Sequence, residues 1–152
     1  ARHKTCSDIM PLRRSTSADM RRRAKNFRGK TRMIDYERLE TRCLSKKGAT
    51  KEYKAEWEAT LYKIGDKMFA MRGADKSGRS IITLKADPTD GAFLRERYKD
   101  IIAGYYMNKT HWNSVYLDGA VPDDLLDDLI DKSYDIILRS LPKKTQKAIL
   151  DQ

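Results

Sequence analysis

The sequence predicts an α+β fold, in which an antiparallel sheet of about five strands in two hairpin-containing units packs against helices. Apolar residues recur at three- and four-residue steps in residues 35–48 and 122–141, the spacing of a buried helix face. Between these stretches lie short runs of alternating polarity separated by turn residues, which is typical of antiparallel strands. The expected order of elements is α-β-β-β-α-β-β-α-α, with no internal repeat.

The first two helices have clear end signals. Asp35 is expected to cap the first helix and Gly48 to close it, because Asp bonds free N–H groups and Gly adopts the left-handed conformation. Asp87 followed by Pro88 predicts the start of the second helix. Its expected apolar face consists of Phe93, Leu94 and Tyr98.

Five runs are expected to form strands: residues 57–64, 68–72, 80–85, 101–107 and 112–117. The last two make a hairpin around residues 108–111. In its second strand, Trp112 and Tyr116 should share one face. Val115 and Leu117 should lie on the other face and be more buried, because side chains alternate along a strand.

The third helix, residues 122–141, is the strongest in the chain, and Pro142 separates it from a short last helix over 143–150. Its expected buried stripe consists of Leu126, Leu129, Ile130 and Ile137. Asp123, Asp127, Asp131 and Asp135 repeat at four-residue steps. A solvated face is the favoured interpretation of this row, with the first three residues exposed, and a cation-binding surface is the alternative.

Positive charge is concentrated at the start of the chain. The protein has 32 Lys+Arg against 22 Asp+Glu, but residues 1–32 alone hold eleven of the cations and two of the acids. We expect residues 1–32 to be a disordered basic extension, and residues 33–152 to form a single domain that is nearly neutral. The alternatives for the extension are a nucleic-acid-binding arm, a mis-assigned start upstream of Met33, and a targeting peptide, which its two acids make a weaker match.

A longer motif then resembles a known family. The string Met107-Asn108-Lys109-Thr110-His111-Trp112-Asn113-Ser114-Val115-Tyr116-Leu117-Asp118-Gly119, with residues 63–70, 84–85, 121–123 and 141–142, is similar to the MmcQ/YjbR family. The resemblance covers about residues 33–150. Its motif residues here are Asn108, Lys109, His111, Trp112, Tyr116, Asp118 and Gly119. Tyr106 departs from the histidine or other polar residue that the family favours.

The resemblance implies a compact α+β fold related to frataxin-like architectures and likened to double-wing DNA-binding domains. Many family members are labelled as DNA-binding, while their biochemical role is not established. Two basic hairpin tips would then meet DNA. The candidate DNA-binding residues are Arg72, Lys76, Arg79, Lys109, Thr110 and His111.

The alternative is a non-enzymatic module that binds a protein or small molecule in an aromatic groove near Trp112, with Tyr105, Tyr106 and Tyr116.

No catalytic residue, metal site or cofactor is expected. Lys109, His111 and Asp118 could form an acid–base set, but we favour a structural turn in which Asn108 and His111 bond the backbone. His3 and Cys6 supply only two of the four ligands of a closed zinc site. The two cysteines and the lack of a long apolar run favour a cytoplasmic protein with no membrane span. A monomer is favoured.

Overall fold

The computed structural model describes residues 34–152, and the predicted basic extension over residues 1–32 lies outside them. Four helices are described: α2 (Tyr36–Leu44), α3 (Pro88–Arg97), α4 (Asp123–Ser140) and α5 (Lys143–Leu150). The strands are β1 (Thr50–Lys54), β2 (Ala59–Ile64), β3 (Lys67–Ala74), β4 (Ser80–Lys85), β5 (Ile101–Ala103) and β6 (Trp112–Tyr116). The predicted α+β class is confirmed.

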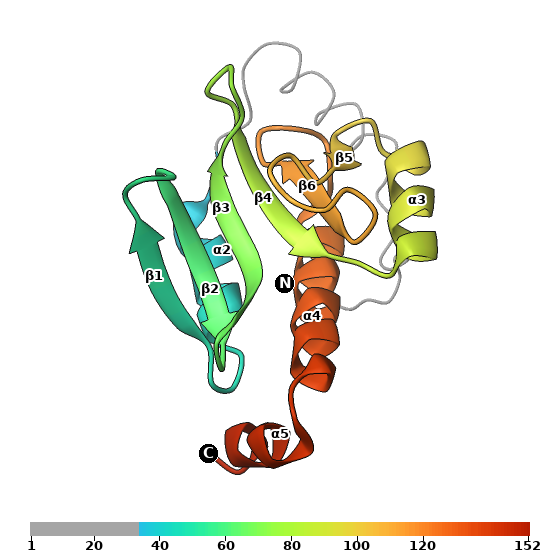
Figure 1. Ribbon diagram of the computed structural model, residues 1–152. Helices are drawn as coiled ribbons and strands as arrows, with labels where there is room; N and C mark the ends of the chain where they lie inside the picture. Colours follow the sequence, from blue (N-terminus) through green and yellow to red (C-terminus); the bar gives the residue numbers. More distant parts are fainter. Residues whose placement is uncertain (1–33) are drawn as a thin grey trace.

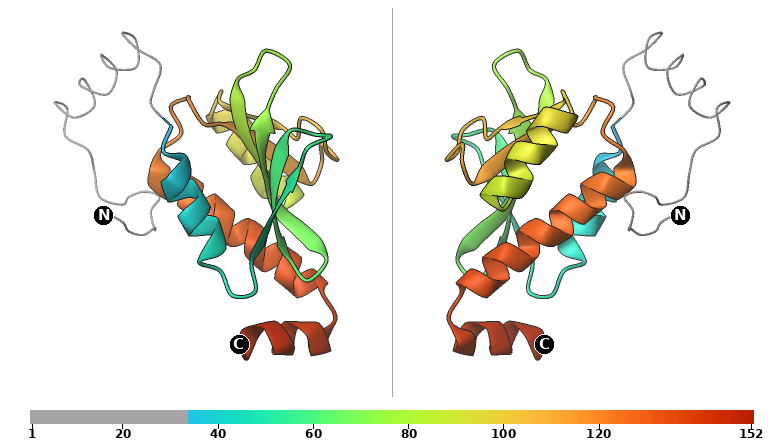
Figure 2. Two further views of the ribbon diagram at one scale, coloured as in Figure 1. Left: turned by 90° about the vertical axis from the view of Figure 1, so that its left-hand side faces the viewer. Right: turned by 90° about the vertical axis from the view of Figure 1, so that its right-hand side faces the viewer.

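The six strands form one antiparallel sheet in the order β1-β2-β3-β4-β6-β5. Helices α2 and α4 lie side by side on one face of this sheet, and α3 lies beyond its β5 and β6 side (Figures 1 and 2). The other face, which is turned toward the viewer in Figure 1, is called the open face here. In the described residues no helix is long and apolar enough to span a membrane.

One strand and several element ends differ from the prediction. β1 was missed because its sequence TKEYK is polar, and an edge strand paired on one side only can expose most of its residues. Trp57 was assigned to a strand but lies in the β1–β2 turn with 61% of its surface exposed. Residues 104–107 leave the sheet after β5, so the last two strands are joined by a long loop in place of a tight hairpin.

The helix caps follow the sequence in part. The Asp35 carboxylate accepts a hydrogen bond from the Arg38 amide, and Asp87 caps α3 with Pro88 in its first turn, as predicted. Gly48 does not close α2, because the helix already ends at Leu44. Phe93, predicted to lie on the apolar face of this helix, is 58% exposed.

The main core lies between the helices and the sheet. Leu126, Leu129, Ile130 and Ile137 of α4 are buried there, as predicted. Val115 and Leu117 belong to the same core, whereas Trp112 and Tyr116 point to the open face, where they lie opposite Lys85 and Ile81. Trp112 is nevertheless 8% exposed, about as buried as Leu117.

The aspartate row of α4 is not a solvated face throughout. Asp123 and Asp135 are exposed, but Asp127 and Asp131 are half-buried against α2. Arg38 bonds Asp127 at 2.5 Å, and both Arg42 and Lys46 pair with Asp131. The expectation of exposed Asp127 and Asp131 was therefore wrong, because the cations of α2 recruit these carboxylates into the helix interface.

Candidate functional site

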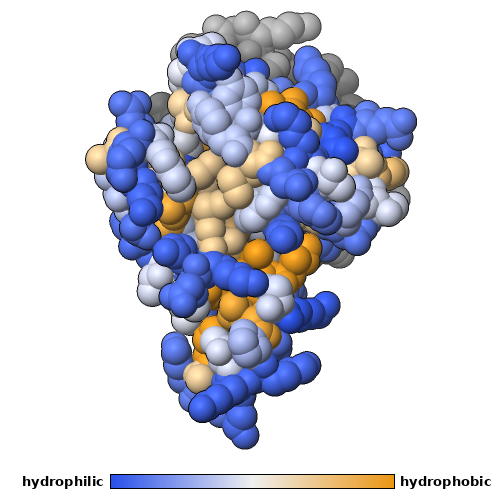
Figure 3. All heavy atoms as spheres, viewed as in Figure 1, coloured by the Kyte–Doolittle hydropathy of each residue, from blue (hydrophilic) through white to orange (hydrophobic). Residues whose placement is uncertain are grey.

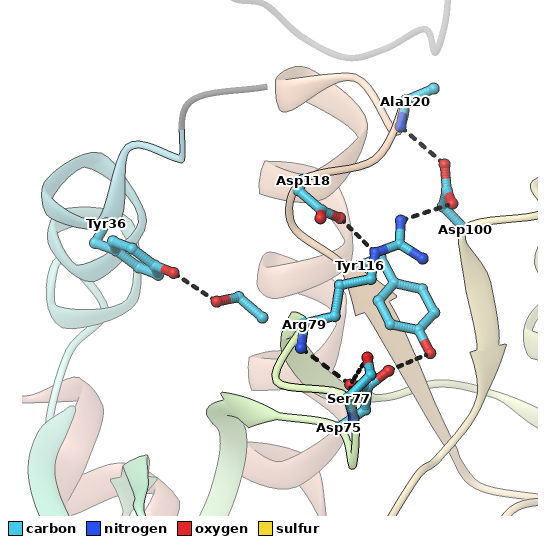
Figure 4. A network of polar contacts seen from close by, with 9 residues as sticks. Tyr36, Asp75, Ser77, Arg79, Asp100, Tyr116, Asp118 and Ala120 are labelled. Carbon is cyan, nitrogen blue, oxygen red and sulfur yellow. Dashed lines mark hydrogen bonds and ion pairs between the residues drawn. The ribbon is translucent and has the colours of Figure 1, made fainter. Parts of the chain in front are cut away.

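An arginine clamp joins three distant parts of the chain near one end of the sheet (Figure 4). The Arg79 Nε donates to Asp118 Oδ1 at 2.8 Å, and its Nη2 lies 3.4 Å from Asp100 Oδ1. The guanidinium also stacks on the Tyr116 ring at 3.9 Å from the centroid. Arg79 thus ties the start of β4 to the end of β6 and to the residue preceding β5.

Asp75 shapes the β3–β4 tip, residues 75–78. Its Oδ1 accepts hydrogen bonds from the Ser77 amide, the Ser77 hydroxyl and the Arg79 amide, while its Oδ2 accepts one from the Tyr116 hydroxyl at 2.9 Å. These bonds, the Ser77 hydroxyl first, lower the pKa of Asp75 to about 2. Burial, and then the Asp75 carboxylate, raises the pKa of Tyr116, so Tyr116 keeps its proton and remains a donor.

Gly119 is required by the same network. An added Cβ at this position would lie 2.5 Å from the Asp100 carboxylate. That carboxylate is buried, faces Arg79 and accepts the Ala120 amide at 2.9 Å. Tyr116, Asp118 and Gly119 of the motif are therefore explained by the contacts of the clamp, without a ligand.

The other half of the motif holds the 104–111 loop. Asn108 Oδ1 accepts the amides of Thr110 at 2.9 Å and His111 at 3.3 Å, and Lys109 Nζ donates to the Gly104 carbonyl at 2.9 Å. Asn108 thus bonds the turn backbone, as the favoured interpretation predicted. Of the proposed acid–base set, Lys109 and Asp118 each bond a different group, Gly104 and Arg79.

Two tyrosines connect this loop to the β3–β4 tip. The Tyr105 hydroxyl accepts the Lys76 amide at 3.0 Å, and the Tyr106 hydroxyl donates to the Ala74 carbonyl at 3.3 Å. Their rings meet edge to face with centroids 4.5 Å apart. Tyr106 remains 60% exposed, so its ring is held in place while most of its surface faces solvent.

The six candidate DNA-binding residues fall into two groups. Arg72 is on the α2 side of the sheet, 5.0 Å above the Tyr36 ring and 4.0 Å from Glu40, and Arg79 belongs to the clamp. Both are occupied by contacts within the chain. Lys76, Lys109, Thr110 and His111 are exposed, and of these Lys109 also bonds the Gly104 carbonyl.

The two predicted tips do not lie at the same end of the sheet. Residues 75–78 precede the first residue of β4, whereas the His111 carbonyl accepts the Ala86 amide just after its last residue. Six residues of extended chain, about 20 Å, separate these positions. Tyr105 and Tyr106 belong to the 104–111 loop, and their hydroxyl groups bond the backbone of Lys76 and Ala74 at the tip.

Sequence reasoning missed Asp75 and Asp100, which complete the clamp. The run Asp75-Lys76-Ser77-Gly78 carries the signal of a turn in which Asp bonds the next amides, but nothing local marks Asp100 as a partner of Arg79. A small cavity of about 130 Å³ lies between α2, β6 and α4, and Trp112 is not among its lining residues.

Comparison with known proteins agrees with the motif. The model of the YjbR family matches residues 44–136. The Escherichia coli (strain K12) protein YjbR, described as uncharacterised, is 34% identical over 108 residues, covering 71% of this chain and 91% of YjbR. The uncharacterised protein YbdF of Escherichia coli O157:H7 is 38% identical over 92 residues, covering 60% of this chain and 75% of YbdF.

Two solved structures share the fold. A Deinococcus radiodurans protein with the domain DUF419 superposes with a TM-score of 0.69 at 28% identity, covering 77% of this chain and 88% of its own. A Pseudomonas syringae protein superposes with a TM-score of 0.57 at 20% identity, covering 68% and 98% of the two chains, and this second likeness concerns the fold alone.

Proposed function

The chain belongs to the YjbR family, and from that premise we propose that it is a non-enzymatic DNA-binding protein of the cytoplasm. The proposed contact surface, called the β4 strip, consists of Lys76, Tyr106, Lys109, Thr110 and His111. It runs beside β4 from the β3–β4 tip to the 104–111 loop. This proposal narrows the six candidate residues to the four exposed ones and adds Tyr106.

The observation that carries the proposal is the junction between the tip and the loop. The bonds from the Lys76 amide to Tyr105 and from Tyr106 to Ala74 join segments some thirty residues apart. The motif residues Tyr116 and Asn108 hold the same two segments, so the backbone that carries Lys76 and Lys109 is fixed before any ligand arrives. Preorganised groups lose less entropy on binding.

The residues of the strip suit the backbone of a nucleic acid. Lys76 and Lys109 can neutralise phosphates and release counterions, and the Thr110 hydroxyl and His111 ring can donate to phosphate oxygens. The fixed ring of Tyr106 offers a face on which a base can stack. We assign Arg79 the role of holding the tip and Arg72 that of joining β3 to α2, since their guanidinium groups already have partners.

The groove alternative has weaker support. Trp112 is 8% exposed, and Lys85 Nζ lies 5.6 Å from its ring centroid, so little of the ring is open to a ligand. The open face does show an apolar area framed by hydrophilic residues (Figure 3). Leu61 and Met71 are almost fully covered there by neighbours that include Met68 and Met107.

Binding of the full chain to a labelled 20-base-pair duplex over a salt series tests the proposal. The double variant Lys76→Ala/Lys109→Ala should bind more weakly and lower the slope of log K against log salt by about two, one for each phosphate contact. The matched control is Lys99→Ala/Lys132→Ala, which removes the same charge from exposed lysines outside the strip. Equal slopes for the two variants would overturn the proposal.

A further inference from the structure

Helix α5 closes the end of the domain that is opposite the β3–β4 tip (Figures 1 and 2). Its Ile149 is buried against Gly48 in the α2–β1 connection. Gln146 Nε2 donates to the Leu141 carbonyl at 2.7 Å, and Lys47 Nζ donates to the Leu150 carbonyl at 3.0 Å. The helix is thus fixed at both ends, and its position relative to the sheet is defined.

Six cations gather at this end: Lys47, Lys67, Arg139, Lys143, Lys144 and Lys147. Lys67 Nζ lies 3.4 Å from the Ser140 hydroxyl, and the Arg139 carbonyl accepts Gln146 at 3.3 Å, so the β2–β3 turn and the end of α4 meet the start of α5. Lys143, Lys144 and Lys147 lie on the outward side of the helix, away from buried Ile149.

Within residues 34–152, none of these six cations forms an ion pair with an acid, as is also true of Lys76 and Lys109 in the β4 strip. The cations of α2 are paired with α4, and Arg72 and Arg79 have carboxylate partners. Within residues 34–152, the β2–β3 turn and the α5 segment contribute two acids, Asp66 and Asp151, and a third, Asp135, lies one helical turn before Arg139; all three are exposed. A nearly neutral domain therefore carries a local excess of positive charge at α5.

We infer that this α5 end, formed by the six cations above, is a second nucleic-acid-binding surface that contacts the phosphate backbone. Lysines act as flexible point charges and carry no planar fork, so they fit phosphates without reading sequence. A membrane surface fits less well, since a helix that lies in a bilayer turns its apolar face to lipid. In α5 Ile149 is packed on the domain, which leaves Leu150, 47% exposed, as the one large apolar side chain of this helix that could face lipid.

The inference goes beyond the proposed function and does not depend on it. The β4 strip extends from the β3–β4 tip along β4, whereas α5 lies at the far end of the domain (Figure 1). A duplex held at one surface therefore leaves the other free for a second segment. Variants at either surface can be compared separately, so one surface can fail while the other holds.

The test uses the full chain and the same 20-base-pair duplex. The triple variant Lys143→Ala/Lys144→Ala/Lys147→Ala should raise the Kd by about tenfold at low salt and lower the log-log salt slope by two to three. The control Arg97→Ala/Lys99→Ala/Lys132→Ala removes three exposed cations elsewhere and should change both quantities much less. A Kd and slope equal to those of the control would overturn the inference.

A second measurement locates the contact in the unmodified protein. Acetylation of lysines, read by mass spectrometry, should be slowed by duplex DNA at Lys143, Lys144 and Lys147 and unchanged at Lys99. If these lysines are acetylated at the same rate with and without duplex, any DNA affinity of the chain lies elsewhere and the inference falls. Protection by vesicles containing phosphatidylserine but not by duplex would also overturn it and assign the surface to lipid.

Discussion

At the scale of single residues, the tightest constraint is the fit of Gly119 against Asp100. A methyl group at this position would enter the space of a carboxylate that bonds Arg79 and Ala120. The carboxylate cannot withdraw without giving up those bonds, and unpaired buried carboxylates are costly. The Asp100 carboxylate therefore restricts residue 119 of the family motif to glycine.

Gly119→Ala should lower the free energy of unfolding by about 1–3 kcal/mol, since the added methyl overpacks a filled site. Urea denaturation measures the change. Gly73→Ala is the matched control, because its Cβ would meet Ala59 at an ordinary 3.4 Å and its stability should change little. Equal effects at the two positions would mean that the Asp100 contact does not restrict residue 119.

Asp75 should make the stability of the fold depend on pH, in a direction that follows from its pKa. Its pKa is about 2 in the folded protein, against an ordinary value of 3.8. A carboxylate with a lowered folded pKa stabilises the fold above its unfolded pKa, and this stabilisation is lost as the pH falls through the folded pKa. The stabilisation from Asp75 should therefore disappear between about pH 4 and pH 2.

Asp75→Asn should be less stable than the parent near neutral pH, and the difference in Tm should shrink between about pH 4 and pH 2. Thermal melts at closely spaced pH values measure it. A difference that stays constant over this interval would show that Asp75 is not held at a low pKa.

At the scale of elements, the sequence predicted correctly those features that depend only on residues within one helix. The aspartate caps of α2 and α3 and the apolar stripe of α4 follow from local patterns, and all are present. β1 was not predictable in this way, because its place depends on pairing with β2 and its own side chains are polar. The burial of Asp127 and Asp131 could not be predicted from α4 alone, because their partners Arg38 and Arg42 lie in α2, nearly ninety residues earlier in the sequence.

The two tryptophans test whether burial, and not residue type, determines how much stability is lost on substitution. Trp112→Ala should cost about 3 kcal/mol, because 92% of its surface is covered by the sheet and the loop. Trp57→Ala should cost less than about 1 kcal/mol, because 61% of the residue is exposed and its only described ring contact is Lys54 at 5.8 Å. Chemical denaturation of both variants gives the comparison, and similar losses would contradict the assigned burial.

The α2–α4 interface can be tested on the aspartate row itself. Asp131→Asn weakens the contacts to Arg42 and Lys46 and should cost about 1 kcal/mol, less at high salt. Asp135→Asn is the control one helical turn away, since this residue is exposed, and its stability should change by less than about 0.5 kcal/mol. A larger loss at residue 135 would contradict the ion-paired interface.

At the scale of the whole molecule, charge is sorted by position. The cations between α2 and α4 and at the clamp form ion pairs that stabilise the fold. Those of the β4 strip and the α5 end have no acidic partner in residues 34–152. Counting the charged residues in the sequence shows only that this region is nearly neutral. Which cations remain for a ligand depends on tertiary pairing, so the candidate site could be predicted only in part.

The central claim is that the β4 strip contacts DNA, and backbone amide chemical shifts of the full chain, titrated with the 20-base-pair duplex, test it most directly. The account predicts shift changes over residues 75–79 and 104–111, and these should be reduced in Lys76→Ala/Lys109→Ala. Full binding of the duplex with unchanged amide shifts in both segments would contradict it.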